Sequence, residues 1–290
     1  MIHANVLYND RIVSSSEAIL RPGQLGLLAG WGVFTTLRIY KGIPFAFERH
    51  WDRLQRDARL LQVEIPVERD ELRRRVLQLV ERNACPEASM RLCIVRSQGG
   101  VFEGPGSGNQ SDIVAFTIDV PQRQDTASLS IQENGRHAES PFAGTKTLSW
   151  SHNLTFVEIA KQQGFDEVIL LNERGEVAEC TSANIFAVID GVTYTPPLSS
   201  GPLPGITRLA MLEELSERVE ERVLHPKDLY GADEVFITST VRELMPVDRI
   251  ADRTLKAADK GEWPVMDGLR AALRRYIDEY IAKAALNATS

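Results

Sequence analysis

Cysteine and clustered histidine are scarce in this 290-residue sequence. Its three cysteines, Cys85, Cys93 and Cys180, form no Cys-x-x-Cys pair, and its five histidines are not clustered. An odd number of separated cysteines argues against a disulfide framework and against a zinc site. We therefore expect no bound metal and a location in the reducing cytoplasm.

Long apolar runs are also missing. The N-terminus, Met1 to Asp10, lacks a basic region followed by an apolar run, and no later segment has 18 uninterrupted apolar residues. The sequence predicts neither export nor a membrane-spanning helix. A net charge of −7 argues against a nucleic-acid surface, although a local basic pocket for a small anion stays possible.

The composition that is present is typical of a soluble globular protein, with 43% hydrophobic and 25% charged residues. The length suits one large or two ordinary domains. A polar stretch with a proline at 121–126 predicts a linker between an N-terminal α/β domain, 1–120, and a C-terminal domain, 127–290. A glycine-rich stretch, Ser97 to Ser111, predicts a loop, and no Gly-Lys-Ser/Thr follows it to make a phosphate loop.

The predicted first domain mixes antiparallel strands with two helices. Turns at Asn9-Asp10 and Lys41-Gly42 predict two hairpins. Apolar residues at helical spacing predict two core faces, formed by Trp51, Leu54, Ala58 and Leu61, and by Leu72, Val76, Leu79 and Val80.

The second domain alternates helices and strands. Helices are predicted at 152–163, closed by Gly164, at 206–219 and at 265–285. Strands are predicted at 167–171, 185–189, 192–194 and 234–238, with turns at 172–175 and 190–191.

A stretch from Gly144 to Phe186 carries the chemistry. Small residues flank Lys146 just before a predicted helix, and Glu179 follows a predicted strand. These positions can place an amine and an acid at opposite ends of one flat ligand. Pyridoxal phosphate requires that geometry, with an amine for the Schiff base and an acid near its ring nitrogen.

Several further segments, in order along the chain, match one family. They are Gly32-Val-Phe-Thr-Thr-Leu-Arg38, His50-Trp-Asp-Arg-Leu54, Glu179-Cys-Thr-Ser-Ala-Asn-Ile-Phe186, Thr195-Pro-Pro-Leu198, Leu203-Pro-Gly-Ile-Thr-Arg208 and Ala232-Asp-Glu-Val-Phe-Ile-Thr-Ser-Thr240. With Lys146, they resemble the class IV, or fold type IV, pyridoxal-phosphate enzymes. The resemblance implies a mixed α/β fold of two domains: a small N-terminal α/β sandwich and a larger C-terminal domain with a pseudo-barrel.

The resemblance also implies roles for individual residues. Lys146 looks like the Schiff-base lysine, which also carries the proton from the substrate Cα, and Glu179 looks like the partner of the pyridine nitrogen. Phosphate contacts are expected from Arg53, from Ile206 and Thr207 at a helix start, and from Ser239 and Thr240. Residues facing the substrate are expected at Phe34, Arg38, Arg96 and Trp150, although either arginine could instead be a surface residue.

Family members differ in reaction, and the sequence is divided between them. Phe34-Thr35-Thr36 resembles aminodeoxychorismate lyases, whereas the segments at 194–208 and 232–236 resemble branched-chain aminotransferases. We expect transfer of an amino group from an apolar, branched-chain L-amino acid to a 2-oxo acid such as 2-oxoglutarate. The alternatives are a 4-amino-4-deoxychorismate lyase that releases pyruvate and 4-aminobenzoate, and a D-amino-acid aminotransferase. The family implies a homodimer or a higher homo-oligomer.

Overall fold

The chain forms two compact units in the computed structural model, which describes residues 1–18, 25–99, 108–122, 124–215 and 219–289. The first unit contains Met1–Gln122, Thr145–Trp150 and Glu279–Ser290. The second contains Arg123–Gly144 and Ser151–Asp278. Thr145–Trp150, the short segment that carries Lys146, packs with the first unit. The residues on either side of this segment belong to the second unit.

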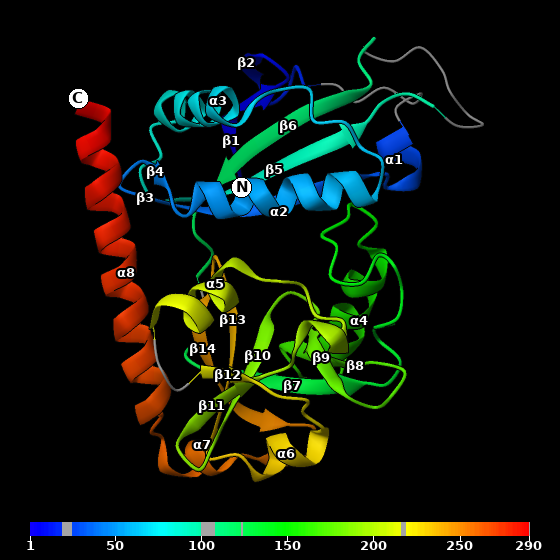
Figure 1. Ribbon diagram of the computed structural model, residues 1–290, viewed down its shortest axis with the longest axis vertical. Coiled ribbons are helices and arrows are strands. Elements are labelled where there is room, and N and C mark those ends of the chain that lie inside the picture. The colour runs from blue at the N-terminus through cyan, green and yellow to red at the C-terminus, as the bar shows by residue number, and fades with distance from the viewer. Residues whose placement is uncertain (19–24, 100–107, 123, 216–218, 290) are drawn as a thin grey trace. The chain divides into compact units, whose positions relative to one another are not determined.

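A six-stranded antiparallel sheet forms the first unit, in the order β2-β1-β6-β5-β3-β4 (Figure 1). Both predicted hairpins are confirmed, since Tyr8 pairs with Arg11 and Tyr40 with Ile43. Lys41 and Gly42 have φ values of 50° and 80°, as a type I′ turn requires. Residues 100–107 of the glycine-rich stretch lie outside the described residues. The strands are β1 (Ile2–Tyr8), β2 (Arg11–Ser14), β3 (Gly32–Tyr40), β4 (Ile43–Pro44), β5 (Ala88–Arg96) and β6 (Ser111–Ile118).

Helices α2 (Phe47–Leu60) and α3 (Arg69–Arg82) bury one face of this sheet, and a short α1 spans Leu25–Ala29. Alternate residues of β3, namely Val33, Leu37 and Ile39, lie in one core cluster with both predicted helical stripes. Leu61 is partly buried against that cluster, and the other members of the stripes are buried. The periodicity argument is therefore confirmed for both helices.

The N-terminus of α2 is capped from the far end of the chain. Ala46, the residue before the helix, has a left-handed φ of 51° and makes no side-chain cap. The Tyr280 hydroxyl accepts the Phe47 N–H at 3.3 Å and donates to Glu48 Oε2 at 2.7 Å. Burial first, and then the Glu48 carboxylate, raise the pKa of Tyr280, so this phenol keeps its proton.

A nine-stranded sheet forms the second unit, in the order β12-β11-β10-β13-β14-β7-β8-β9, with β15 paired to β14. The sheet curls back on itself, because Val177 of β9 donates its N–H to Leu224 O, three residues after β12 ends. The predicted pseudo-barrel is thereby confirmed. The strands are β7 (Ala127–Gln132), β8 (Glu167–Leu171), β9 (Val177–Cys180), β10 (Asn184–Ile189), β11 (Val192–Thr195), β12 (Val219–Glu221), β13 (Glu234–Ser239), β14 (Glu243–Ile250) and β15 (Arg253–Thr254).

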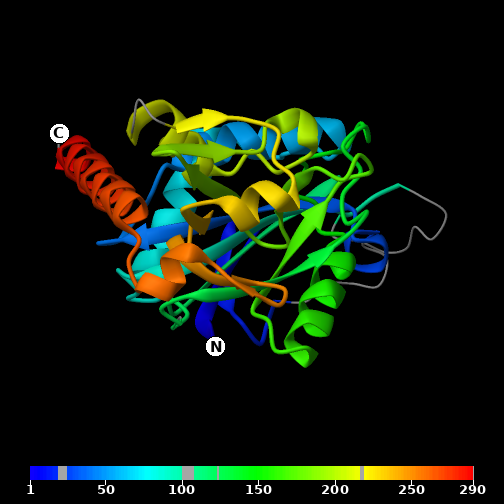
Figure 2. The same ribbon diagram turned by 90° about the horizontal axis from the view of Figure 1, so that it is seen from below.

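Two of the three helices predicted in the second half of the chain are confirmed, and the third is wrong at its end. Helix α4 (Ser151–Gln162) packs along β7 and β8 (Figure 2) and is followed closely by Gly164, whose φ is 81°. The predicted helix 206–219 was wrong at its end, because Val219 lies in β12 and pairs in parallel with Thr193. The other helical segments are η1 (Leu198–Ser200), α5 (Ile206–Ala210), the π-helical η2 (Met211–Leu215), α6 (Pro226–Gly231), α7 (Lys256–Lys260) and α8 (Pro264–Thr289), whose residues from Glu279 on belong to the first unit.

Across the described residues, the helices lack the combination of length and apolar character that crossing a bilayer requires.

Helix α3 offers a matched test of the first core. Leu79 is fully buried, whereas Leu77, two residues away, is 36% exposed. Leu79→Ala should lower the free energy of unfolding by about 2–5 kcal/mol, because it removes buried methyl groups and leaves a cavity. Leu77→Ala should change it by less than about 0.5 kcal/mol. Urea unfolding followed by circular dichroism measures both, and equal losses would contradict the assigned core face.

Candidate functional site

The predicted site residues fall in both units. Arg53, Lys146 and the substrate-side residues lie in the first, while Glu179, Ile206, Thr207, Ser239 and Thr240 lie in the second.

The backbone of Lys146 is fixed on both sides. Its carbonyl oxygen accepts the N–H of Phe34 on β3 at 3.0 Å, and its own N–H donates to Asp57 Oδ2 at 3.0 Å. Asp57 lies on α2, is 1% exposed, and also accepts a hydrogen bond from Arg56 Nε at 2.9 Å. The lysine therefore starts from a rigid point on the sheet and helix.

The Lys146 amine is bordered by aromatic rings. Its Nζ lies 4.6 Å from the centroid of Phe34 and 6.0 Å from that of Trp150, and the two rings meet edge to face at 6.1 Å. Arg91 places its guanidinium 4.3 Å from the Phe34 centroid and 5.8 Å from that of Trp150. Two predicted substrate-side residues, Phe34 and Trp150, are thus brought together with Lys146, and so is an arginine that was not predicted.

The two predicted substrate-side arginines are engaged elsewhere. Arg38 forms an ion pair with Glu87 at 2.8 Å and donates to Ala88 O. Arg96 donates to Gln62 O and Gln98 O and lies over the Trp31 ring.

Strand register places Arg91 beside Phe34. Arg91 pairs in register with Thr36 and Cys93 with Phe34, so Arg91 shares a sheet face with Phe34. Arg38 lies on that face too, but four residues from Phe34 along β3, so the face alone does not separate the two arginines.

Arg53 takes part in a buried polar group with Thr35 and His50. Its Nη2 donates to Thr35 Oγ1 at 2.9 Å, and the same hydroxyl lies 2.6 Å from His50 Nδ1. All three side chains are at most 8% exposed. Burial first, and then the positive charges of Arg53 and Lys146, hold the pKa of His50 well below 6.5, so its ring is neutral at pH 7.

The Thr35 hydroxyl accepts from Arg53 Nη2 and has one hydrogen to donate. If it donates that hydrogen to His50 Nδ1, the proton of the neutral imidazole lies on Nε2. Among the described residues that Nε2 has no hydrogen-bond partner and is buried. His50 opens the His50-Trp-Asp-Arg-Leu54 segment, a signal from which sequence reasoning took only Arg53.

Glu179 of β9 is 7% exposed and has a donor on each oxygen. Arg136 Nε donates to Oε1 at 2.8 Å, and the Leu203 N–H donates to Oε2 at 3.0 Å. Each carboxylate oxygen has two lone pairs, so Glu179 keeps the capacity to accept a further donor.

The start of α5 leaves no room for a side chain. Gly205 precedes the helix, and a Cβ there would lie 2.0 Å from Asn184 Oδ1. Asn184 Nδ2 in turn donates to Leu203 O at 2.8 Å. Ile206 and Thr207 are buried in the first turn, where backbone N–H groups have no partner within the helix and favour an anion.

The exit of β13 supplies hydroxyl groups. Ser239 Oγ accepts the Arg242 N–H at 3.1 Å, and Thr240 follows directly after the strand. Thr238 Oγ1 is buried and has no hydrogen-bond partner within the described part of the chain.

Each unit by itself holds groups of the kinds that bind pyridoxal phosphate. The first has a fixed lysine beside aromatic rings, and it also buries Arg53 and His50, whose Nε2 has no partner among the described residues. The second has a carboxylate with spare acceptor capacity, a helix start that only glycine permits and, beside Ser239, the Thr238 hydroxyl, which has no partner in the described part of the chain.

The cysteines are poorly suited to act as nucleophiles. Cys85, Cys93 and Cys180 are all free and buried. Burial raises the pKa of Cys93 to about 11 and that of Cys180 well above its usual value. These two thiols therefore keep their protons near neutral pH, although Cys180 directly follows Glu179.

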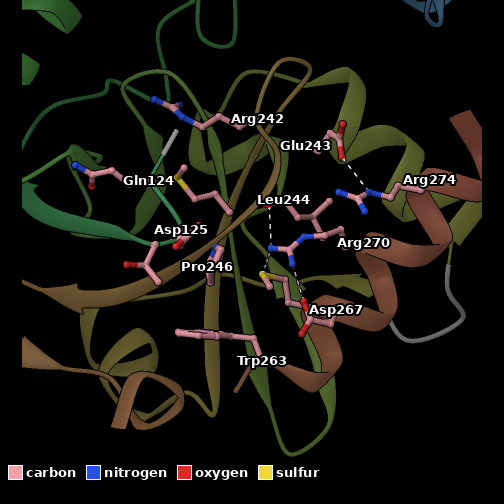
Figure 3. A pocket seen from close by; sticks show the side chains of 13 residues that line it. Gln124, Asp125, Arg242, Glu243, Leu244, Pro246, Trp263, Asp267, Arg270 and Arg274 are labelled. Carbon is pink, nitrogen blue, oxygen red and sulfur yellow. Dashed lines mark hydrogen bonds and ion pairs between the residues drawn. The ribbon is translucent and has the colours of Figure 1, made fainter. Parts of the chain in front are cut away.

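A hollow of about 460 Å³ lies elsewhere in the second unit (Figure 3). Its wall includes Trp263, Arg270 and Arg274, but none of the predicted site residues. Arg270 pairs with Asp267 at 2.7 Å and Arg274 with Glu243 at 3.7 Å, so these charges are already balanced.

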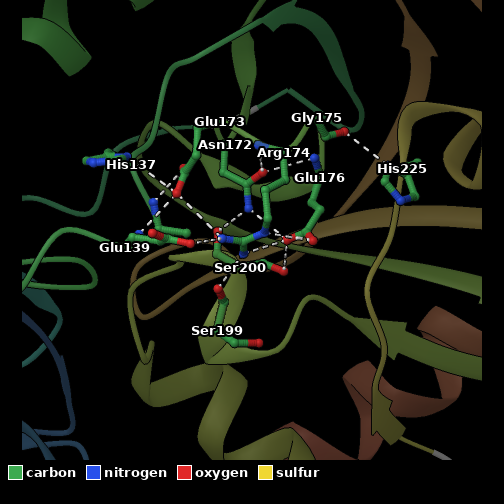
Figure 4. Close-up of polar contacts among 11 residues, drawn as sticks. His137, Glu139, Asn172, Glu173, Arg174, Gly175, Glu176, Ser199, Ser200 and His225 are labelled. Atoms are coloured by element: carbon green, nitrogen blue, oxygen red, sulfur yellow. Dashed lines mark hydrogen bonds and ion pairs between the residues drawn. The ribbon is translucent and has the colours of Figure 1, made fainter.

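The predicted turn at 172–175 is confirmed between β8 and β9 and carries a dense polar network (Figure 4). Glu173 accepts the N–H of Ala138 at 2.8 Å and that of Glu139 at 3.1 Å. These backbone bonds, with smaller contributions from His137, lower the pKa of Glu173 to about 2. Arg174 first, and then Asn172 and Ser200, lower the pKa of Glu176 to about 2.

Comparison with known proteins identifies the family. The family model for amino-transferase class IV matches residues 32–250. The chain belongs to this family. Class IV aminotransferases depend on pyridoxal phosphate, so the chain is an enzyme of that transaminase type.

Curated relatives divide between three activities. The chain is 29% identical to the D-alanine aminotransferase of Bacillus licheniformis over 96% of this chain and 99% of the relative. It is 28% identical to the branched-chain-amino-acid aminotransferase of Escherichia coli K12 over 83% of each. It is 29% identical to the aminodeoxychorismate lyase of Bacillus subtilis over 85% of this chain and 87% of the relative.

Solved structures agree with the fold. The branched-chain aminotransferase of the thermophilic archaeon Thermoproteus uzoniensis, solved with norvaline, superposes with a TM-score of 0.85 at 26% identity, over 95% of each chain. The fold type IV prediction is confirmed.

Thr35 gives a test of the buried polar group. Thr35→Val keeps the shape but leaves Arg53 Nη2 and His50 Nδ1 without their shared hydroxyl, so the cofactor-free protein should lose about 1–3 kcal/mol of stability. Thr36→Val, at the partly exposed neighbouring position, is the control. Thermal unfolding compares the two variants, and equal midpoints would show that the hydroxyl is not used.

Glu173 gives a test against pH. Because its pKa is depressed from 4.5 to about 2, its bonds stabilise the fold above pH 4.5, and this stability is lost as pH falls towards 2. Glu173→Gln should lower stability at neutral pH and weaken its dependence on pH between 4.5 and 2. The matched control is Glu158→Gln on exposed α4. Parallel stability curves for wild type and Glu173→Gln would contradict the assignment.

Proposed function

We propose that this chain transfers the amino group of an apolar, branched-chain L-amino acid to a 2-oxo acid such as 2-oxoglutarate. The observation that carries the proposal is the setting of Lys146, whose amine lies over the rings of Phe34 and Trp150 while its backbone is fixed by Phe34 and Asp57. Aromatic walls around the reacting amine favour an apolar substrate side chain and exclude water.

Each residue predicted on the cofactor side has a task in this proposal. Pyridoxal phosphate, when bound, supplies the carbonyl that the amine attacks and the ring that accepts electrons from the substrate Cα. Lys146 Nζ would hold the cofactor covalently and, once released, would carry the proton from the substrate Cα. Glu179 would accept the N–H of the pyridine ring, and Arg53, Thr207, Ser239 and Thr240, with the N–H groups at Ile206, would bind the phosphate.

Substrate carboxylate binding has one new candidate. Arg91 lies over the same two rings as Lys146, whereas Arg38 and Arg96 are engaged with Glu87 and with Gln62 O and Gln98 O. We therefore add Arg91 to the proposed substrate side, with Phe34 and Trp150 as its apolar wall.

The lyase remains the second candidate, and D-amino-acid transamination the third, because relatives of all three kinds match: branched-chain aminotransferases at 28–31% identity, and a D-alanine aminotransferase and a lyase at 29% each. The Phe34-Thr35-Thr36 likeness to lyases has less weight than its sequence suggested. Thr35 is buried and hydrogen-bonded to Arg53 and His50, a supporting contact that does not by itself distinguish the two reactions. We propose a cytoplasmic homodimer or higher homo-oligomer for either activity.

The decisive experiment follows the absorbance of cofactor-loaded protein after addition of L-leucine alone, with D-alanine in a parallel cuvette. For the proposed function, L-leucine converts the lysine-bound band to that of pyridoxamine phosphate faster than D-alanine does. A faster change with D-alanine would transfer the proposal to the D-amino-acid enzyme. If neither amino acid changes the band, pyruvate release from aminodeoxychorismate tests the lyase.

Lys146 is tested by substitution. Lys146→Ala should abolish the visible band of bound cofactor and lower turnover by several orders of magnitude, because the nucleophile and proton carrier are one residue. Lys161→Ala, an exposed lysine on α4 paired with Glu158, is the control and should retain both. A visible band retained in Lys146→Ala would exclude it as the attachment point.

A further inference from the structure

Two hydrogen-bond donors from separate parts of the second unit hold the Glu179 carboxylate. Arg136 holds Oε1 at 2.8 Å and the Leu203 N–H holds Oε2 at 3.0 Å. Arg136 comes from the segment after β7, and Leu203 from the segment between η1 and α5. Neither segment is regular secondary structure, so each needs support from elsewhere to aim its donor.

Arg136 is itself held in place. Its backbone N–H donates to Leu171 O at 3.1 Å, and its Nη1 donates to Asn153 Oδ1 at 3.2 Å and to its neighbour Gly135 O at 3.1 Å. Asn153 Nδ2 donates to Thr181 O, two residues after Glu179. The guanidinium therefore connects α4, its own segment and the strand end that carries the carboxylate.

The turn at 172–176 supports the segment that carries Arg136. Glu173 of this turn accepts the N–H groups of Ala138 and Glu139 at 2.8 and 3.1 Å, just after Arg136 in the chain (Figure 4). A carboxylate that accepts two consecutive N–H groups fixes the backbone direction of the segment.

The same turn supports the segment that leads to Leu203. Asn172 Nδ2 donates to Ser200 O at 3.1 Å, Ser200 Oγ donates to Glu176 Oε2 at 2.9 Å, and Arg174 Nη2 donates to Ser199 O at 2.8 Å (Figure 4). Gly201 has a φ of 92°, and a Cβ there would lie 3.0 Å from Ala138 Cα. The segments that carry Arg136 and Leu203 thus both bind the 172–176 turn, and they also contact each other at Gly201 and Ala138.

We propose that Arg136 is a positioning residue for Glu179, aimed by the 172–176 turn, and that its contribution to the reaction passes through that carboxylate. The inference rests on the proposed pairing of Glu179 with the ring nitrogen of the cofactor. Without the guanidinium, the carboxylate keeps one of its two fixing donors and can rotate away from the ring.

The test is a double-mutant cycle on cofactor-loaded protein, with the L-leucine half-reaction as the rate. Arg136→Gln should slow the half-reaction by about 10- to 100-fold, the usual effect of removing a partner that orients a site residue. In a Glu179→Gln background the same substitution should cost less than about twofold, because it has no carboxylate left to orient. Arg136→Lys should restore part of the rate.

A spectroscopic reading separates orientation from folding. The pH dependence of the cofactor absorbance should shift in Arg136→Gln, because the acceptor at the ring nitrogen is displaced. The thermal unfolding midpoint of the cofactor-free protein measures any loss of stability separately. Arg249→Gln, which removes hydrogen bonds to Gly164 O and Ala251 O in the same unit, is the matched control and should shift neither absorbance nor rate.

The outcomes are distinguishable. The positioning role would be overturned if Arg136→Gln slowed the half-reaction equally in the wild-type and Glu179→Gln backgrounds, or if it changed neither rate nor absorbance, as expected for Arg249→Gln. The proposed function would still stand in that case, provided that the wild-type protein transaminates L-leucine. Wild-type protein that binds no pyridoxal phosphate would overturn both.

Discussion

The fixed backbone of Lys146 is the constraint on which the rest of the site depends. A long flexible side chain delivers its amine reproducibly only if its Cα is immobile. Here the peptide groups on both sides of that Cα are hydrogen-bonded, one to β3 and one to a buried carboxylate on α2. The cost of burying Asp57 is offset by the donors that surround it, so the core of the first unit and the proposed Schiff-base lysine are stabilised by the same contacts.

Helix α2 shows how one element serves packing and chemistry together. Trp51, Leu54 and Ala58 lie in the core cluster, while His50, Arg53 and Asp57 occupy buried polar positions of the same helix. The polar residues recur three and four positions apart, which gathers them along one stripe. The helix therefore holds Arg53, the proposed phosphate ligand, at a fixed distance from Asp57, which accepts the Lys146 N–H.

Sequence reasoning predicted most elements of the fold because apolar periodicity and turn chemistry are local signals. It extended a helix to Val219, where tertiary pairing with Thr193 favours a strand over helical spacing. Arg96 was selected over Arg91 because the facing of β5 depends on its register with β3, which one strand cannot reveal. Arg38 does share a face with Phe34, but its ion pair with Glu87 has no local signal in the sequence. The Leu203 N–H that holds Glu179 could not be predicted either, since a backbone donor has no residue signature.

The three buried thiols have a practical consequence. Because Cys85, Cys93 and Cys180 are all enclosed, and the latter two have raised pKa values, the native surface offers maleimide or iodoacetamide reagents no ready target. A single cysteine introduced on an exposed helix would then be the preferred attachment point for a fluorophore or spin label. The wild-type background can serve distance measurements between the two units without first removing its own cysteines.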